Sequence, residues 1–124
     1  MHALIVDDST TIRKILTAYL QKLGFDVTAA VNGRDGLDQL RAMKKADVVL
    51  VDWNMPEMDG ITCLRALRAM DLNPRPVVVM CTTENGMSKI REALEAGADE
   101  YIMKPYDQGV LLDKLTQVGL VEQA

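Results

Sequence analysis

The sequence predicts an α/β protein in which one open, doubly wound sheet of five parallel strands is covered by five helices. Short apolar runs rich in β-branched residues alternate with longer segments whose apolar side chains recur every three or four positions. A helix between consecutive runs is the connection that parallel strands require. The length of 124 residues suits one such sheet, because a closed barrel of strand–helix units needs about twice as much chain.

The elements of the first half follow from the periodicity of their apolar residues. The apolar runs are too short for comfortable helices, and the segments between them place apolar side chains on one helical face. Gly24 predicts a helix end, and Asn32-Gly33 predicts a turn. The expected elements are a strand over residues 3–6, a helix over 10–23, a strand over 25–31, a helix from 37 to about 44 and a strand over 48–51.

The second half repeats this alternation. Pro56 and Gly60 predict a turn after the central strand, Pro56 through its fixed φ and Gly60 because glycine adopts conformations that other residues resist. Asn73-Pro74 breaks the following helix, and Gly97 ends the next one. The expected elements are a helix over residues 61–68, a strand over 77–80, a helix over 87–96, a strand over 101–103 and a helix over 110–118.

Composition and charge restrict the class of protein. The net charge of −4 and the isoelectric point near 4.9 argue against binding to nucleic acid or to an anionic membrane. No apolar run approaches the roughly 20 residues of a membrane span, and the first strand begins too early for a signal peptide to precede it. We therefore expect a single domain over residues 1–124 without an output module, acting as a cytoplasmic monomer. Cys63 and Cys81 are expected to be small buried residues, and His2 a frayed terminal residue.

Polar residues follow four of the five expected strands. The carboxyl ends of parallel strands share one edge of the sheet, which is where open α/β sheets place their chemistry. The strand over residues 25–31 ends in apolar residues, as expected for a strand at the outside of the sheet. The residues that we expect to converge are Asp7, Asp8, Asp52, Thr82 and Lys104.

The three carboxylates of this group predict a metal site. Clustered carboxylates repel one another, and a divalent cation neutralises them. Mg²⁺ suits the group because it takes oxygen ligands and retains several waters, whereas Ca²⁺ prefers more protein oxygens than these loops offer. We expect Asp8 and Asp52 to bind Mg²⁺ directly and Asp7 to contact it through water. Asn54 is the candidate to supply a backbone carbonyl as the chain turns.

Lys104 and Thr82 indicate a function beyond metal binding. A cation and a hydroxyl opposite a metal-bound carboxylate can hold the oxygens of a phosphoryl group. Asp52 is then the candidate nucleophile, which forms an aspartyl-phosphate. Taken singly, each of these residues has a simpler role, such as capping a helix or a turn. Their convergence at one sheet edge favours phosphoryl transfer.

These residues resemble the signature of bacterial response-regulator receiver domains, and the resemblance covers essentially the whole chain. The matching residues are Asp7-Asp8, Asp52, Thr82 and Lys104-Pro105, and the stretch from Asp52 to Gly60 is similar to that of chemotaxis regulators. The family implies a flavodoxin-like strand order of 2-1-3-4-5. It also implies that Asp52 takes a phosphoryl group from the phosphohistidine of a sensor histidine kinase, with Mg²⁺ held at Asp7, Asp8 and the Asn54 carbonyl. Lys104-Pro105 is expected to be cis.

The resemblance further implies a conformational switch and its partners. Thr82 and Tyr101 match the switch pair, and Asn54 and Glu84 match positions that tune autodephosphorylation. The last two helices and the strand between them are the expected docking face for a downstream protein. In chemotaxis that protein is a flagellar motor switch protein, and a dedicated phosphatase is a further candidate partner.

Several alternatives stay open at this point. Within the family, the chain is also compatible with a phosphorelay shuttle that passes the group to a histidine-phosphotransfer protein, or with a phosphorylation-independent binding module. Whether it counts as an enzyme is left open, since a receiver catalyses only its own phosphorylation and dephosphorylation. A haloacid-dehalogenase-like phosphatase needs an Asp two residues after the nucleophile, where this chain has Ser9 or Asn54. A flavodoxin-like nucleotide binder needs a glycine-rich loop after the first strand, which is absent.

Overall fold

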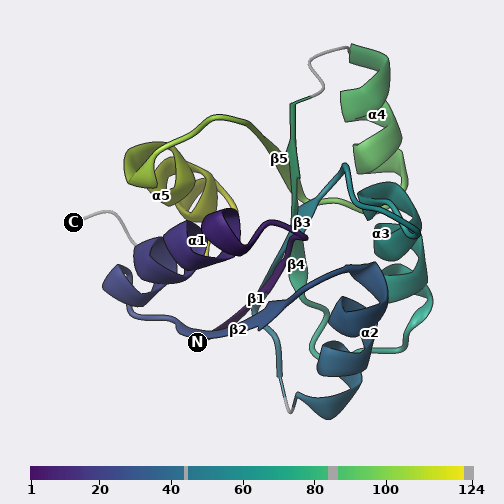
Figure 1. Cartoon of the computed structure of the whole chain (residues 1–124), viewed down its shortest axis with the longest axis horizontal. Coiled ribbons are helices and arrows are strands. Elements are labelled where there is room, and N and C mark those ends of the chain that lie inside the picture. The colour runs from purple at the N-terminus through teal and green to yellow at the C-terminus, as the bar shows by residue number, and fades with distance from the viewer. Residues whose placement is uncertain (44, 84–86, 122–124) are drawn as a thin grey trace.

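The computed structural model, which describes residues 1–43, 45–83 and 87–121, contains five strands alternating with five helices (Figure 1). The elements are β1 (His2–Val6), α1 (Thr10–Lys22), β2 (Asp26–Ala30), α2 (Gly33–Ala42), β3 (Val48–Asp52), α3 (Gly60–Ala69), β4 (Val77–Thr82), α4 (Met87–Glu95), β5 (Glu100–Met103) and α5 (Gln108–Gln117). The strands form one parallel sheet in the order β2-β1-β3-β4-β5, which confirms the expected fold class and strand order.

The sheet has an apolar core on each of its faces. Helices α1 and α5 cover one face, and α2, α3 and α4 cover the other (Figure 1). Successive residues of the fully buried strand β3 alternate between the two cores: Val49 and Val51 pack under α2 and α3, and Val48 and Leu50 pack under α1 and α5. Burial on both faces explains why β3 is an uninterrupted apolar run up to Asp52.

Most boundaries differ from the sequence-based predictions by one to four residues, and hydrogen bonds explain three of the differences. Strand β4 continues to Thr82, because it still pairs with β5 there and the Lys104 N–H donates to the Thr82 carbonyl at 2.8 Å. Helix α2 begins at Gly33, because the Asn32 side chain accepts from the Asp35 N–H at 2.8 Å and caps the helix. The prediction of a frayed His2 is wrong: this residue belongs to β1, and its ring nitrogen lies 2.7 Å from Thr28 Oγ1.

Gly60 has a different role from the predicted one. It begins α3 and lacks a positive φ, whereas Glu57 in the preceding turn has a φ of 68°. A Cβ atom at position 60 would collide with the Asp52 carbonyl oxygen and lie 2.7 Å from Trp53 Cα. A glycine is therefore required here because two backbone segments approach closely.

Cys63 and Cys81 are buried free thiols, as predicted. Burial raises the pKa of the Cys63 thiol to about 11 and that of Cys81 to about 12, so both stay protonated at neutral pH. Among the described residues, no helix is long and apolar enough to cross a membrane.

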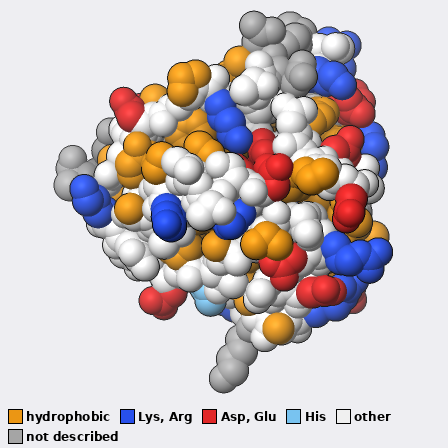
Figure 2. Space-filling view, in the orientation of Figure 1, with side chains coloured by type: hydrophobic (Ala, Val, Ile, Leu, Met, Phe, Trp, Pro, Cys, Tyr) orange, Lys and Arg blue, Asp and Glu red, His pale blue; other side chains and the backbone are white. Residues whose placement is uncertain are grey.

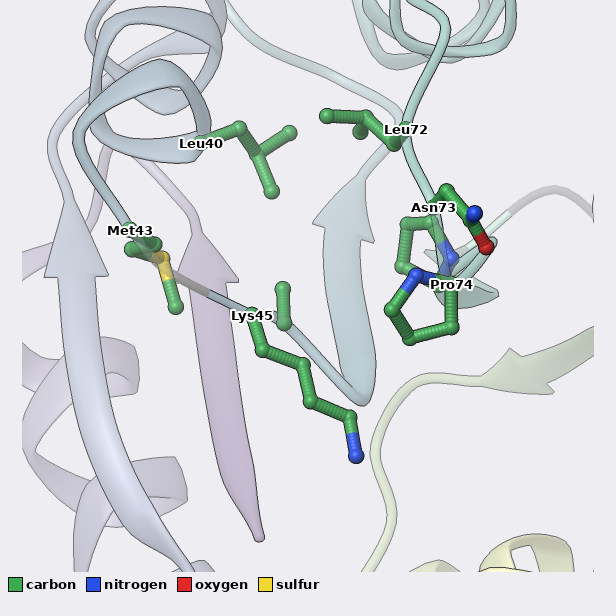
Figure 3. Close-up of a pocket in the computed structure, with 8 residues that line it drawn as sticks. Leu40, Met43, Lys45, Leu72, Asn73 and Pro74 are labelled. Atoms are coloured by element: carbon green, nitrogen blue, oxygen red, sulfur yellow. The ribbon is translucent and has the colours of Figure 1, made fainter.

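A small cleft of about 30 Å³ lies between the end of α2 and the segments that lead into β3 and β4 (Figure 3). Leu40, Met43 and Leu72 line its apolar side, and Asn73 and Pro74 lie across from Lys45. The cleft therefore lies at the amino ends of the central strands, opposite to the edge at which the polar residues gather.

Candidate functional site

Three carboxylates meet at the carboxyl edge of the sheet. One oxygen from each of Asp7, Asp8 and Asp52 lies within 4.8 Å of the others. Asp7 and Asp52 are buried, at 2% and 6% exposure, while Asp8 is exposed. Figure 2, which has the orientation of Figure 1, shows acidic side chains near the middle of this face of the molecule. The predicted convergence of these residues is thus present in the structure.

Backbone hydrogen bonds fix the position of Asp52 at the end of β3. The N–H of Trp53 donates to the Cys81 carbonyl of β4 at 2.9 Å, so pairing continues one residue past Asp52. The N–H of Gly60 then donates to the Trp53 carbonyl at 2.8 Å and closes the loop over residues 53–59. The Asp52 carboxylate is therefore attached to a hydrogen-bonded strand, and the loop over residues 53–59 returns close to its own start.

Asp7 is held by its neighbours in sequence and by α1. One of its carboxylate oxygens accepts the Ser9 N–H at 2.8 Å, and Ser9 in turn caps α1 by accepting from the Ile12 N–H. The guanidinium of Arg13 donates to the Asp7 backbone carbonyl at 2.8 Å. The other oxygen of Asp7 therefore remains directed at the acidic group, where Lys104 lies 3.3 Å from it.

Lys104 bridges two of the three carboxylates. Its Nζ lies 2.9 Å from Asp52 Oδ1 and 3.3 Å from Asp7 Oδ2. Lys104 follows β5, and the peptide bond between it and Pro105 is cis, as the family resemblance implied. Lys104 therefore extends from the end of edge strand β5 to the carboxylates of Asp7 and Asp52.

Burial and Lys104 act in opposite directions on the pKa of Asp52. Burial raises the pKa of Asp52, and the charge of Asp7 adds to this effect; Lys104 opposes it without cancelling it. Burial by itself lowers the pKa of Lys104, but its contacts with Asp52 and Asp7 outweigh burial, and the net pKa is raised. Among the residues that the structure describes, three carboxylates share one ammonium, and the surplus negative charge favours a further cation.

The donor set fits Mg²⁺. All three side chains offer carboxylate oxygens, which this hard ion prefers, and exposed Asp8 leaves one side of the group open to water. Lys104 already contacts Asp7 and Asp52, so Asp8 is the carboxylate without this ammonium contact. The Asn54 side chain points to a different neighbour, since its Nδ2 donates to Thr83 Oγ1 at 3.4 Å.

The remaining predicted residues are spread around this edge. Thr82 is buried at the end of β4, next to the acidic group along the sheet edge. Tyr101 is half-buried on β5, and the Lys114 ammonium lies 4.9 Å from the centroid of its ring. The predicted role of Glu84 lies outside the described residues.

Sequence reasoning missed two residues that contact the site. The Arg13 guanidinium donates to the Asp7 carbonyl, and the Lys89 ammonium lies 5.4 Å from the centroid of the Trp53 ring. Neither of them has a motif of its own. The spacing of six residues between Asp7 and Arg13 is the only sequence signal, and it becomes useful once the start of α1 is known.

A comparison with protein-family models matches residues 3–116 to the response regulator receiver domain. The chain belongs to this family. The receiver is 40% identical over 119 residues to the chemotaxis protein CheY1 of Helicobacter pylori J99, covering 95% of this chain and 96% of the relative. It is 41% identical over 120 residues to the chemotaxis protein CheY-3 of Vibrio cholerae, covering 95% and 91%.

Solved structures agree with this assignment. The receiver superposes on the chemotaxis protein CheY4 of Vibrio cholerae with a TM-score of 0.88 and 33% identity, covering 94% of this chain and 97% of the other. It superposes on a chain of the CheX-CheY-BeF3-Mg+2 complex of Borrelia burgdorferi with a TM-score of 0.89 and 32% identity, covering 95% and 88%. This protein is therefore a receiver domain similar to chemotaxis response regulators.

Proposed function

We propose that this receiver is the phospho-acceptor protein of a cytoplasmic two-component system and that Asp52 takes its phosphoryl group from the phosphohistidine of a sensor histidine kinase. The supporting observation is the setting of Asp52. Its carboxylate is buried at the end of the central strand, within 4.8 Å of Asp7 and Asp8 and 2.9 Å from the Lys104 ammonium. A phosphorelay shuttle would use this same site, so the observation supports phospho-acceptance at Asp52 and leaves the protein that reads it to the partner experiments.

In the transfer, a carboxylate oxygen of Asp52 forms a bond to phosphorus as the bond from phosphorus to the histidine nitrogen breaks. The histidine leaves with the electron pair of the broken bond. Lys104 already lies beside Asp52, so its ammonium can pair with an oxygen of the incoming phosphoryl group. The Thr82 hydroxyl is the proposed second donor to that group, from the end of the neighbouring strand.

Asp8 and Asp52 are the proposed direct ligands of Mg²⁺, with Asp7 reaching it through water and Asn54 adding its backbone carbonyl. Bound Mg²⁺ supplies positive charge that balances the carboxylates and the oxygens of the transferred group. The composition of the described site supports this assignment, because three carboxylates lie within 4.8 Å of one another and Lys104 pairs with only two of them.

The proposed output is a change in the surface formed by α4, β5 and α5. Thr82 moves toward the phosphoryl group, and Tyr101 turns into the space that this movement opens. Asn54 and Glu84 set how long the phosphate survives. The similarity to chemotaxis proteins supports a flagellar motor switch protein as the partner of this surface. A dedicated phosphatase is a further proposed partner.

Trp53 provides the test of this proposal, because it is the sole tryptophan and the neighbour of Asp52. Its fluorescence is followed while Mg²⁺ and then beryllofluoride are added to the wild-type protein and to Asp52→Asn. We expect a saturable response to Mg²⁺ and a second response to beryllofluoride that is absent in Asp52→Asn. Equal second responses in the two proteins would place the anion elsewhere and refute Asp52 as the acceptor.

A further inference from the structure

Lys89 occupies a position that is unfavourable for a lysine within its own helix. It lies in the first turn of α4, which contains no acidic residue. The amino end of a helix carries partial positive charge, so a cation there destabilises the helix by a few tenths of a kcal/mol to about 1 kcal/mol. A residue that destabilises its own helix is expected to have a role elsewhere in the structure.

The Lys89 ammonium instead contacts the loop that follows the acceptor. It lies 5.4 Å from the centroid of the Trp53 ring, within the range at which a cation is attracted to an aromatic face. Trp53 is 5% exposed, whereas the Lys89 side chain is 46% exposed. The lysine therefore reaches from the surface of α4 to a buried ring directly after Asp52.

The same ammonium acts on the other end of this loop. The pKa of the Asp59 carboxyl is lowered, first by its hydrogen bonds with Thr62 and further by the charges of Arg65 and Lys89. Asp59 caps α3, and the next N–H along the chain closes the loop on Trp53. Lys89 thus interacts with the residues at both ends of the segment 53–59.

A second link joins the same two helices through exposed groups. Glu92 of α4 lies 3.4 Å from Arg65 of α3, and it lies 4.0 Å from Lys89 on its own helix. These side chains are 39% to 57% exposed, and ion pairs of this kind contribute little. Of the two interactions between α4 and the segments beside it, the contact of Lys89 with the buried Trp53 ring is therefore expected to be stronger than the exposed Arg65–Glu92 ion pair.

We propose that Lys89 is a positioning residue that holds the amino-terminal part of α4 against the acceptor loop through Trp53, and so transmits the state of that loop to α4. This route is separate from the one through Thr82 and Tyr101. Its signalling meaning rests on the proposed phospho-acceptor function, but the contact itself does not. The state of Asp52 would then affect the surface of α4, β5 and α5 at two places, through Lys89 at α4 and through Tyr101 at β5.

The first test measures backbone amide hydrogen exchange of α4 in Lys89→Met, Lys89→Arg and the wild type. If Lys89 anchors α4, Lys89→Met speeds exchange in α4 by about two- to fivefold. Lys89→Arg retains the cation and exchanges at the wild-type rate. A lysine that acted only within its helix would give the opposite sign, since its removal would relieve the unfavourable charge and slow exchange. Lys14→Met, at an exposed site on α1, is the control for removing a surface lysine.

The second test adds Mg²⁺ and beryllofluoride to the same proteins. We expect Lys89→Met still to bind beryllofluoride, seen as a saturable change in Trp53 fluorescence, while the accompanying change in α4 exchange falls at least twofold. A full α4 response in Lys89→Met would overturn transmission through Lys89. Absence of any response in the wild type would refute the proposed function, and the comparison without beryllofluoride would still decide whether Lys89 anchors α4.

Discussion

The ammonium of Lys104 lies 2.9 Å from Asp52 Oδ1, although 52 positions separate the two residues. This pair joins the end of the central strand to the residue that follows edge strand β5. The pairing does not make Asp52 an ordinary surface carboxylate, because burial and the nearby Asp7 keep its pKa raised. The clustered negative charge at this site therefore lowers the stability of the folded protein, as residues required for function often do.

Asp52→Asn is expected to stabilise the protein at neutral pH by about 0.5–2 kcal/mol. Asparagine keeps the shape of the side chain and can still accept a hydrogen bond from Lys104, but it removes one of the clustered charges. The pKa of Asp52 is raised from 3.8 in the folded protein, so the stability that its protonation contributes is complete below 3.8 and is lost as the pH rises through the folded-state value. The advantage of the variant is therefore largest at neutral pH and shrinks as the solution is acidified. Urea unfolding of both proteins across this range measures the difference, and a difference that does not change with pH would contradict the assigned cause.

Mg²⁺ is expected to stabilise the wild-type protein through Asp8. At a free concentration of about 100 times the dissociation constant, binding adds about 2.7 kcal/mol to the free energy of unfolding. Asp8→Asn removes an exposed ligand without disturbing the core, so the variant should fold and lose most of this gain. The measurement is thermal or urea unfolding with and without MgCl₂ at constant ionic strength. Asp38→Asn, at an exposed site on α2, is the matched control and should keep the full gain; equal gains in the two variants would exclude Asp8 as a ligand.

Gly60→Ala is expected to damage both the fold and the acceptor. The new methyl group would meet the backbone of Asp52 and Trp53, which cannot rotate away as a side chain can. We expect a loss of about 1–3 kcal/mol of stability and a weakened Trp53 response to beryllofluoride. Gly109→Ala on α5 is the control, because its Cβ would meet only the Asp107 side chain at 3.3 Å and alanine favours the helix. A Gly60→Ala protein with wild-type stability and response would show that the close approach is unimportant.

The acidic group was predictable from sequence because of the topology. Once the strands are parallel, Asp7, Asp52 and Lys104 lie at the same edge of the sheet, and the strand order then brings β1 and β3 side by side with β5 two strands from β3. The boundaries of helices and strands were less predictable, because a capping side chain or one more hydrogen bond between strands moves them by a few residues. Asn32 caps α2 and so sets its start, and the pairing of Thr82 with β5 extends β4.

Contacts between elements were the part that sequence reasoning could not supply. Lys89 meets Trp53 only because α4 packs beside the start of the acceptor loop, and no spacing along the chain encodes that distance. The requirement for a glycine at position 60 was predicted for the wrong reason. Glycine is needed both where φ is positive and where two backbone segments approach closely, and the sequence does not distinguish these two cases. The role proposed for Tyr101 came from the family resemblance and stays a prediction.

Lys114 is expected to oppose the proposed movement of Tyr101. Its ammonium lies 4.9 Å from the centroid of the Tyr101 ring and 3.4 Å from Glu100 Oε1, which also accepts the Tyr101 N–H. These contacts hold the ring in its half-buried position, and an inward turn would break the contact with the cation. Lys114→Met should therefore tighten the apparent affinity for beryllofluoride by about two- to fivefold in a Trp53 fluorescence titration, whereas Lys114→Arg should not.

The Tyr101→Ala background separates this effect from a general loss of surface charge. If Lys114 acts through the ring, Lys114→Met changes the affinity for beryllofluoride in the wild type and leaves it unchanged when Tyr101 is already alanine. The same fold-change in both backgrounds would assign the effect to the charge of Lys114 itself. No change in either background would mean that the ring position seen here does not limit the response of the acceptor site, and the coupling between Asp52 and the partner surface would then have to pass through α4.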